Sequence, residues 1–366
     1  MVETLRSGWL TTGLKSKKFE EDFAAYIGAP HAVAVNSCTA ALHLALDAVG
    51  IKAGDEVIVP TMTFTATAEV VLYLGARPVL VDCQEDTLNI DPEAMEKAIG
   101  PKTKAVMPVD FAGQPCELGK ILEIARDRKL AVIEDAAHAL PARHQGKMVG
   151  TLSDITCFSF YATKTITTGE GGMATTANPQ WADRMRMMSL HGISKDAWKR
   201  YTASGSWYYE VEYPGYKYNL TDMAAALGLV QLKRADEFYR ARKRIAALYH
   251  AGFADVPEIH RPVVRDDVQH AWHLYVVQLE LDRLRIGRDE FIEALKKENI
   301  GTSVHFIPLH LHPFYRNAFG YKAGDFPNAR AAFERIISLP IFPGMTDEQV
   351  ARVIDAVRAI VIEHRR

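Results

Sequence analysis

The chain has 366 residues, 48% of them hydrophobic and 24% charged, with a formal net charge of −2 at pH 7. A chain of this length and composition can bury a large core and predicts more than one compact unit. The near-neutral charge gives no basic surface that would indicate nucleic-acid binding, and no apolar run is long enough to predict a membrane span. The four cysteines form no Cys-x-x-Cys pair, so we expect reduced thiols, no metal site and a cytoplasmic protein.

Strands and helices are predicted to alternate through the first 135 residues. Residues 8–28 predict a loop and an amphipathic helix, because Phe19, Phe23 and Tyr26 recur at helical spacing. Strands are then predicted at 31–35, 56–60, 78–82, 104–108 and 131–135. Helices are predicted at 40–49, 92–99 and 119–128, and residues 61–68 are predicted to open a further helix. This alternation is typical of a mostly parallel sheet covered on both faces, whose ligands lie beyond the carboxyl ends of the strands.

Small hydroxyl residues and an aromatic residue follow the first two strand ends. Ser37 and Thr39 open a helix, where free N–H groups and the helix dipole favour a phosphate. From this pattern alone, an ordinary helix cap at Ser37 or Thr39 is the preferred interpretation. Phe64 opens the next helix, where its ring could stack on a flat ligand or simply join the core.

Two ionisable residues follow later strands. Asp135 ends an apolar strand, so its carboxylate needs hydrogen bonds or a cation; it is either a helix cap or the partner of a protonated ring nitrogen. Lys164 lies between the predicted strand 155–160 and a Gly-Glu-Gly-Gly turn. It is either an ordinary loop lysine or a desolvated amine that forms a Schiff base with a carbonyl cofactor. Together, the lysine and the aspartate indicate pyridoxal phosphate.

The C-terminal part has its own pattern. We expect a long connecting helix at 223–249, a strand at 272–279, a helix at 287–298, a strand and loop at 299–308, and helices from 327 and from 346. The cluster of His305, His310 and His312 could be a metal site or surface histidines, but its spacing fits no clean zinc pattern. The aromatic-rich segment 201–213 predicts either a mobile loop over a substrate or an oligomer contact.

Several motifs follow one another along the chain: 8–13 (Gly-Trp-Leu-Thr-Thr-Gly), 36–42 (Asn-Ser-Cys-Thr-Ala-Ala-Leu), 60–64 (Pro-Thr-Met-Thr-Phe), 134–138 (Glu-Asp-Ala-Ala-His), 158–160 (Phe-Ser-Phe) with Lys164, and 170–172 (Glu-Gly-Gly). With these motifs in this order, almost the whole chain resembles the DegT/DnrJ/EryC1/StrS sugar aminotransferases, which are pyridoxal-phosphate enzymes of fold type I. Segment 214–222 is similar to that of the member that makes UDP-4-amino-4-deoxy-L-arabinose. The resemblance implies an α/β, aspartate aminotransferase-like fold, with a large cofactor-binding domain (1–235) and a small C-terminal α/β domain (236–366).

The resemblance also implies a role for each matching residue. Lys164 would form the internal aldimine and then move the proton between substrate and cofactor. Asp135 would pair with the pyridine nitrogen, His138 would lie near the ring oxygen, and Phe64 would stack on the ring. The phosphate would be held by Cys38, Thr39, Ala40 and Ser159 and, from the neighbouring subunit of a homodimer, by Asn219. The candidates for contact with the substrate are His305, His310 and Lys217.

The activity implied is transamination of a nucleotide-linked keto-sugar, with L-glutamate as donor and 2-oxoglutarate as product. Segment 214–222 favours C4 of a UDP-4-keto sugar. The alternatives are a C3 aminotransferase on a dTDP-keto-sugar, a glutamine-dependent aminotransferase on an inositol ketone, and a cofactor-binding sensor without turnover. A dehydratase of the family would carry histidine in place of Lys164. Neither nucleic acid nor a membrane is expected as a partner.

Overall fold

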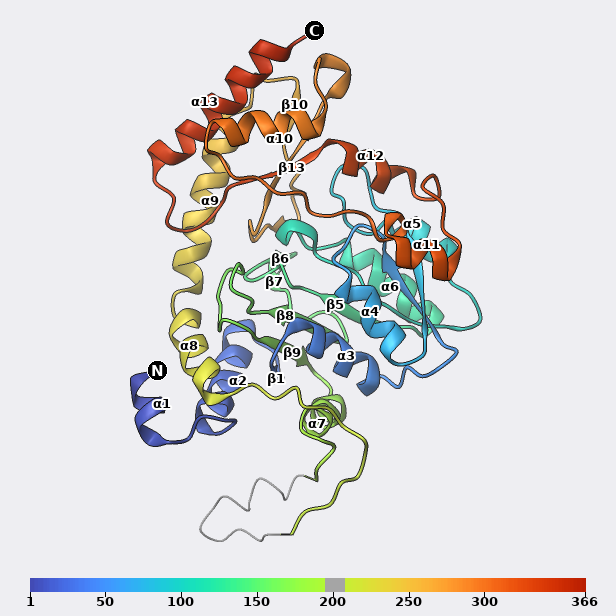
Figure 1. The fold of residues 1–366 in the computed structure, drawn as a ribbon. Helices are drawn as coiled ribbons and strands as arrows, with labels where there is room; N and C mark the ends of the chain where they lie inside the picture. Colours follow the sequence, from blue (N-terminus) through green and yellow to red (C-terminus); the bar gives the residue numbers. More distant parts are fainter. Residues whose placement is uncertain (195–207) are drawn as a thin grey trace.

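A seven-stranded sheet forms the centre of the structure, a computed structural model that describes residues 1–194 and 208–366 (Figure 1). The strand order is β1-β9-β8-β5-β4-β2-β3. The strands are β1 (His31–Val35), β2 (Glu56–Pro60), β3 (Arg77–Val81), β4 (Thr103–Val106), β5 (Ala131–Asp135), β8 (Ile155–Ser159) and β9 (Gly172–Thr176). Neighbours pair in parallel except for β9, which is antiparallel to both β1 and β8. This is the mixed, mostly parallel sheet that the sequence predicts.

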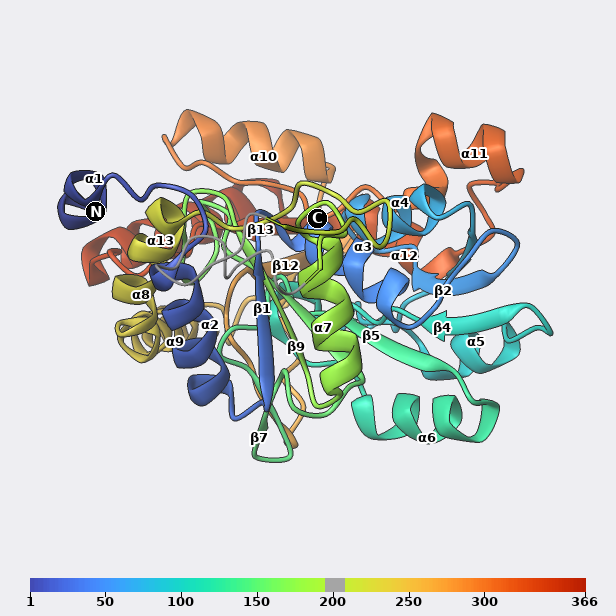
Figure 2. The same cartoon turned by 90° about the horizontal axis from the view of Figure 1, so that it is seen from below.

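Helices cover both faces of this sheet (Figure 2). Val57 and Val59 of β2 join one core with α3, α4 and α7, whereas Ile58 joins the core of the opposite face with α5 and α6. Successive side chains of a strand point to opposite faces, so strands covered on both sides read as nearly continuous apolar runs. The helices of this part are α1 (Val2–Ser7), α2 (Leu14–Ile27), α3 (Cys38–Ala48), α4 (Ala66–Tyr73), α5 (Pro92–Lys97), α6 (Leu118–Arg128), α7 (Pro179–Met188) and α8 (Asp222–Leu232).

The C-terminal part contains a smaller sheet with its own core. Its order is β10-β12-β13, from β10 (Ile259–His260), β12 (Tyr275–Leu279) and β13 (Ile336–Leu339). The helices are α9 (Ala235–Gly252), α10 (Arg288–Lys297), α11 (Pro313–Phe319), α12 (Pro327–Arg335) and α13 (Asp347–His364). Helix α9 runs from the larger sheet to this part, where its side chains pack with α10 and α13 (Figure 1). A third sheet, β11-β6-β7, pairs β11 (Val268–Gln269) with the hairpin of β6 (Arg143–His144) and β7 (Lys147–Met148).

Two predictions about the C-terminal part are wrong. The single helix expected at 223–249 is two helices, α8 and α9, because Arg234 has φ −104° and ψ 1° and leaves the helical conformation. No strand forms at 299–308 in the described chain; only Ser303 makes a bridge, to Ser338 of β13. In the ranges that the structure describes, no helix is both long and apolar enough to cross a membrane.

Candidate active site

The predicted site residues come together because of the direction of the strands. Strands β1, β2, β4, β5 and β8 run the same way, so the loops that follow them meet at one edge of the sheet. Cys38 and Asp135 raise the pKa of Lys164, and Lys164 lowers the pKa of His138. These four side chains therefore lie near one another at this edge. Cys38 and Lys164 are 126 positions apart in the sequence, and the parallel strands bring their loops together.

Lys164 lies in a closed loop between β8 and β9. The amide of Phe160 donates to the Gly171 carbonyl at 2.8 Å, and the amide of Thr168 donates to the Phe160 carbonyl at 3.0 Å. The Lys164 side chain is half-buried, and burial lowers the pKa of its amine, while Cys38 and Asp135 oppose this effect. A lowered pKa favours the neutral amine, which is the nucleophilic form.

Asp135 is a buried carboxylate held by neutral donors. Its Oδ2 accepts from the Thr67 hydroxyl at 2.8 Å, and its Oδ1 accepts from the Ala137 amide at 3.1 Å. Burial raises the pKa of Asp135, whereas these two hydrogen bonds and Lys164 lower it. A desolvated carboxylate of this kind is stabilised when a cation comes close. The side chain therefore suits a protonated ring nitrogen.

The first turn of α3 forms the corner predicted for the phosphate. Ser37 caps the helix, since its hydroxyl accepts from the Ala40 amide at 3.0 Å. The Ala40 amide thus already has a partner, whereas helix geometry leaves the other first-turn amides, those of Cys38 and Thr39, without partners in the helix. Thr39 is half-buried, and Ser159 at the end of β8 is also half-buried and pairs with Gly172 of β9.

Gly172 lets this corner form. A Cβ added there would lie 2.6 Å from the backbone nitrogen of Cys38 and closer still to the carbonyl of Ser37. Because these are backbone atoms, they cannot turn aside as a side chain would. The glycine of the Glu-Gly-Gly motif is therefore required for close packing between β9 and the phosphate corner.

We expect Gly172→Ala to weaken cofactor binding by about tenfold or more and to destabilise the protein by about 1–3 kcal/mol, the usual cost of overpacking. Spectrophotometric titration with pyridoxal phosphate and thermal unfolding measure the two effects. Gly301→Ala is the matched control, since a Cβ at Gly301 meets no atom within 4 Å. A Gly172→Ala protein that binds the cofactor like the wild type contradicts this role.

Aromatic and histidine side chains form a wall beside Lys164. Phe306 stacks on His138, with ring centroids 5.9 Å apart and planes at 22°. The Phe64 ring lies 6.0 Å from that of Phe306 and is 59% exposed, so it is accessible to a flat ligand. Burial, reinforced by Lys164, lowers the pKa of His305 to about 4 and that of His138 well below its usual range. Both histidines are therefore neutral near pH 7.

The three candidates for substrate contact have different surroundings. His305 is half-buried beside Lys164, and its Nδ1 lies 2.8 Å from the Ser338 hydroxyl. His310 is fully buried (0% exposed), and its Nδ1 lies 2.8 Å from the Thr61 hydroxyl, so its ring is not open to a ligand in this structure. Lys217 is exposed, and its amine donates to the side chain of Asn219.

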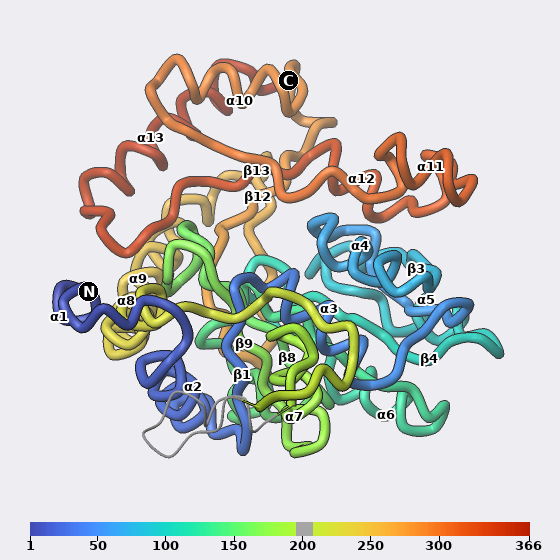
Figure 3. The backbone as a smooth tube through the Cα atoms, turned by 60° about the horizontal axis from the view of Figure 1, so that its bottom comes forward, coloured from blue at the N-terminus to red at the C-terminus, as the bar shows by residue number. Residues whose placement is uncertain are grey.

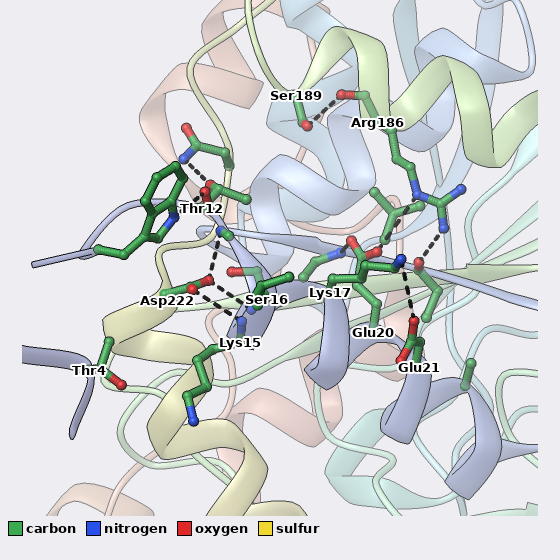
Figure 4. Close-up of a pocket in the computed structure, with 18 of the residues that line it drawn as sticks. Thr4, Thr12, Lys15, Ser16, Lys17, Glu20, Glu21, Arg186, Ser189 and Asp222 are labelled. Carbon is green, nitrogen blue, oxygen red and sulfur yellow. Dashed lines mark hydrogen bonds and ion pairs between the residues drawn. The ribbon is translucent and has the colours of Figure 1, made fainter. Parts of the chain in front are cut away.

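Asn219 lies beside the carboxyl end of β1, where it makes an antiparallel bridge with Val35. Its side-chain amide donates to the Thr12 hydroxyl at 2.6 Å, and the residue lines a cavity of about 890 Å³ between α1, α2, β1 and α7 (Figure 4). Asp222, on the same wall, accepts hydrogen bonds from the amides of Gly13, Lys15 and Ser16. The aromatic-rich segment 201–213 is described only from Tyr208 onward; Tyr201 and Trp207 lie outside the described residues.

Two contacts of the site were not predicted from the sequence. Thr67, which holds Asp135, follows the Pro-Thr-Met-Thr-Phe motif by three residues, and its partner Thr63 belongs to that motif. The two threonines are four residues apart, on either side of the start of α4, and this spacing is a signal that could have found the contact. His273, whose ring lies 4.3 Å from that of His138, lies outside the sequence motifs named above.

The residues present fit pyridoxal phosphate. A buried carboxylate with only neutral hydrogen-bond donors, a partly desolvated amine, a glycine-dependent helix corner and an open aromatic face occupy one edge of the sheet. The Nδ1 atom of His138 is also buried without a hydrogen-bond partner among the described residues, so polar capacity remains for a ligand. Fold and site together define a pyridoxal-phosphate enzyme of fold type I.

Comparison with known proteins gives the family. Residues 1–358 match the DegT/DnrJ/EryC1/StrS aminotransferase family, and the chain belongs to it. It is 55% identical over 362 residues to the spore coat polysaccharide biosynthesis protein SpsC of Bacillus subtilis, covering 99% of this chain and 93% of SpsC.

Two solved structures are similar over nearly the whole chain. Spr1654 of Streptococcus pneumoniae, named as a sugar aminotransferase and solved in its PMP form, is 38% identical with a TM-score of 0.94, covering 99% of this chain and 95% of that one. PseC of Helicobacter pylori, an aminotransferase involved in the biosynthesis of pseudoaminic acid, is 30% identical with a TM-score of 0.92 and the same coverage. The chain is thus a pyridoxal-phosphate-dependent sugar aminotransferase, which acts on a sugar and an amino donor.

Among the described residues, no group of three or more His, Cys, Asp or Glu side chains could hold a metal ion.

Proposed function

We propose that this enzyme transfers the amino group of L-glutamate to the keto group of a nucleotide-linked sugar, at C4 of a UDP-4-keto sugar. The observation that carries the chemistry is the partly desolvated Lys164 amine beside the buried carboxylate of Asp135. Segment 214–222 supports the C4 assignment by its resemblance to the member that makes UDP-4-amino-4-deoxy-L-arabinose. SpsC is named for polysaccharide biosynthesis, and an amino-sugar for a polysaccharide is the product class that we propose here.

Each residue of the site has a proposed task. Pyridoxal phosphate, when bound, supplies an electron sink that stabilises negative charge on the reacting carbon. Lys164 would hold the cofactor through its amine, and this amine would also move a proton to and from the substrate carbon. Asp135 keeps a proton at the ring nitrogen, and Thr67 orients its carboxylate.

The remaining residues hold the ligands. Cys38 and Thr39 offer first-turn amides, and with Ser159 they bind the phosphate. Ala40 lies in the same turn and completes the phosphate site. Phe64 covers the ring face, and neutral His138 donates a hydrogen bond to the ring oxygen. His305 and Lys217 contact the sugar nucleotide, while buried His310 instead fixes the loop at Thr61.

We propose that the enzyme is a homodimer and that Asn219 serves the partner's phosphate site. An apolar patch supports this: Leu5 of α1, Leu10, Leu14 of α2 and Val230 of α8 are all more than 40% exposed, and Leu14 is 82% exposed. Helices α1 and α2 lie beside α8, so the patch adjoins the wall that carries Asn219 (Figure 3). Exposed apolar residues gathered on one face are typical of an interaction surface.

Leu14→Glu should weaken this dimer by about 30-fold or more, the effect of losing a central interface residue. Sedimentation velocity over a range of concentrations measures the shift, and turnover should fall in parallel because Asn219 is separated from the site that it serves. Ile362→Glu, at an exposed position of α13 outside the patch, is the control. A Leu14→Glu protein that stays dimeric at every concentration contradicts the assignment.

We further propose that residues 1–235 and 236–366 are the large and small domains of the enzyme. The support is that one face of the sheet β10-β12-β13 has its own core with α9, α10 and α13, although Val276 and Ile336 of this sheet join the core of α3 and α4. Limited proteolysis followed by mass determination tests this boundary. We expect cleavage near Lys233–Ala235.

The proposed donor and acceptor are tested by following the cofactor. Glutamate added to the loaded enzyme should remove its visible absorbance band and release 2-oxoglutarate, and a UDP-4-keto sugar should restore the band. A band that responds to glutamine but not to glutamate would exclude the proposed donor. A band that responds to no amino donor would indicate a sensor without turnover.

A further inference from the structure

A third histidine, His273, contacts the active site from the C-terminal part of the chain. Its ring is 5% exposed and lies 4.3 Å from the ring of His138, with the two planes at 39°. The Nδ1 atoms of both rings are buried, and neither has a hydrogen-bond partner among the described residues. The contact between the two rings is therefore one of packing, and each keeps hydrogen-bonding capacity.

His273 shares the electrostatic environment of the site. Burial lowers the pKa of His273 well below its usual range, and His138, Lys164, Arg242 and His305 lower it further. Both imidazoles of the pair are therefore neutral near pH 7, so they touch without charge repulsion. A neutral imidazole has one N–H group and one lone pair, so the nitrogen that faces a ligand decides whether the ring donates or accepts.

The backbone around His273 is held in an unusual conformation. Trp272, the residue before it, has φ 55°, in the left-handed region that bulky residues rarely adopt. The Trp272 amide donates to Nδ1 of His270 at 2.8 Å. On the other side, the amides of Ala271 and Leu274 donate to the carbonyls of Gly113 and Ala112 at 2.7 and 3.1 Å. The segment is thus fixed against the loop that follows β4.

Arg242 of α9 holds the same segment from behind. It is 4% exposed, and its Nη1 donates to the carbonyls of Trp272, His273 and Ile341 at 3.2, 3.0 and 3.0 Å. Burial lowers the pKa of Arg242 to about 10, and within the described ranges it forms no ion pair. A buried guanidinium without a carboxylate is costly, so its bonds to these carbonyls are a specific structural requirement.

We propose that His273 is a positioning residue of the cofactor site: it packs against His138 so that one fixed nitrogen of His138 faces the cofactor's ring oxygen, and Arg242 and the left-handed Trp272 hold it there. This inference rests on the proposed role of His138. It makes the cofactor site depend on a segment next to β12, more than a hundred residues from His138 in sequence.

The test compares His273→Ala, which removes the packing, with His273→Phe, which keeps a planar ring but has no nitrogen. The probe is the visible absorbance band of the holoenzyme, recorded against pH. We expect His273→Ala to shift the midpoint of the pH titration by about one unit, a tenfold change in a protonation equilibrium, and His273→Phe to restore the wild-type midpoint. His260→Ala, an exposed histidine paired with Glu280, is the control.

The outcomes separate the inference from its basis. If His138→Ala leaves the titration unchanged, the proposed role of His138 fails and the inference fails with it. If His138→Ala shifts the midpoint and His273→Ala does not, only the inference fails. If His273→Phe shifts the midpoint as much as His273→Ala does, His273 acts through its nitrogens, which overturns a packing role.

Arg242 gives an independent check. If Arg242 acts through His273, the double variant Arg242→Met with His273→Ala should show the same midpoint as His273→Ala alone, because coupled residues are not additive. Additive shifts would contradict the link. Thermal unfolding of each apoprotein accompanies the spectra, and should Arg242→Met not fold, the pair His273→Ala and His273→Phe decides the question alone.

Discussion

Lys164→Ala should reduce transamination by about 10⁴-fold, at the upper end of what one positioned proton-transfer group contributes. The substitution removes both the covalent attachment of the cofactor and the base that moves the substrate proton. Borohydride reduction followed by peptide mass mapping measures the attachment, and steady-state assay measures the turnover. The variant should still bind pyridoxal phosphate, since the phosphate corner and Asp135 remain intact.

Lys147→Ala, at an exposed position in the β6–β7 hairpin, is the control for this experiment and should react like the wild type. A Lys164→Ala protein that still forms a borohydride-stable adduct at the same site would contradict the assignment. The same result would reopen the interpretation of Lys164 as an ordinary loop residue.

The lowered pKa of Lys164 also predicts a gain in stability for an inactive variant. Where the folded-state pKa of a lysine lies below its unfolded value, the unfolded chain binds more protons, so stability rises with pH between the two values. Lys164→Met apoprotein should therefore have a higher melting temperature than the wild-type apoprotein near pH 7. The part of the difference that is due to ionisation should vanish above pH 10.5, the ordinary pKa of the amine.

Asp135→Asn should reduce turnover by about 10²–10⁴-fold, corresponding to the roughly 3–5 kcal/mol lost when one partner of a buried ion pair is removed. Asparagine keeps the size of the side chain but cannot hold a proton on the ring nitrogen. The absorbance of the bound cofactor should change with the protonation state of its ring, and the rate of α-proton exchange of glutamate should fall with turnover.

The raised pKa of Asp135 also predicts the direction in which Asp135→Asn changes the stability of the apoprotein. Burial raises the pKa of Asp135, so the folded apoprotein binds more protons than the unfolded chain between pH 3.8 and the raised value, and stability falls as pH rises through this range. Asp135→Asn removes this loss, and the apoprotein should be more stable than the wild type at neutral pH. Asp183→Asn, on α7, is the matched control for turnover. Full activity of Asp135→Asn would contradict the role of the carboxylate.

The convergence of Lys164, Asp135 and His138 could be predicted from the sequence. Each follows an apolar strand, and parallel strands place their carboxyl ends at one edge. Local pattern and one topological rule were sufficient for these three residues. The small residues after β1 were likewise predictable as the start of a helix, although only the structure shows that Ser37 takes the Ala40 amide.

Other features depend on contacts that a pattern does not contain. His273 reaches His138 because Trp272 adopts a left-handed conformation, which its bulky side chain gives no reason to expect. The break between α8 and α9 contains neither glycine nor proline, so the helical pattern continues through it. His310 is buried, and its ring forms a hydrogen bond with the hydroxyl of Thr61, which is 249 residues away in the sequence. The hydropathy of the sequence does not predict such a contact.

The visible absorbance spectrum of the purified protein with pyridoxal phosphate, recorded before and after excess glutamate, tests whether Lys164 and Asp135 form a working cofactor site. We expect a visible band that depends on Lys164 and disappears with glutamate, with 2-oxoglutarate formed in equal amount. The absence of a visible band after addition of pyridoxal phosphate would contradict the assignment of Lys164 and Asp135 to a working cofactor site.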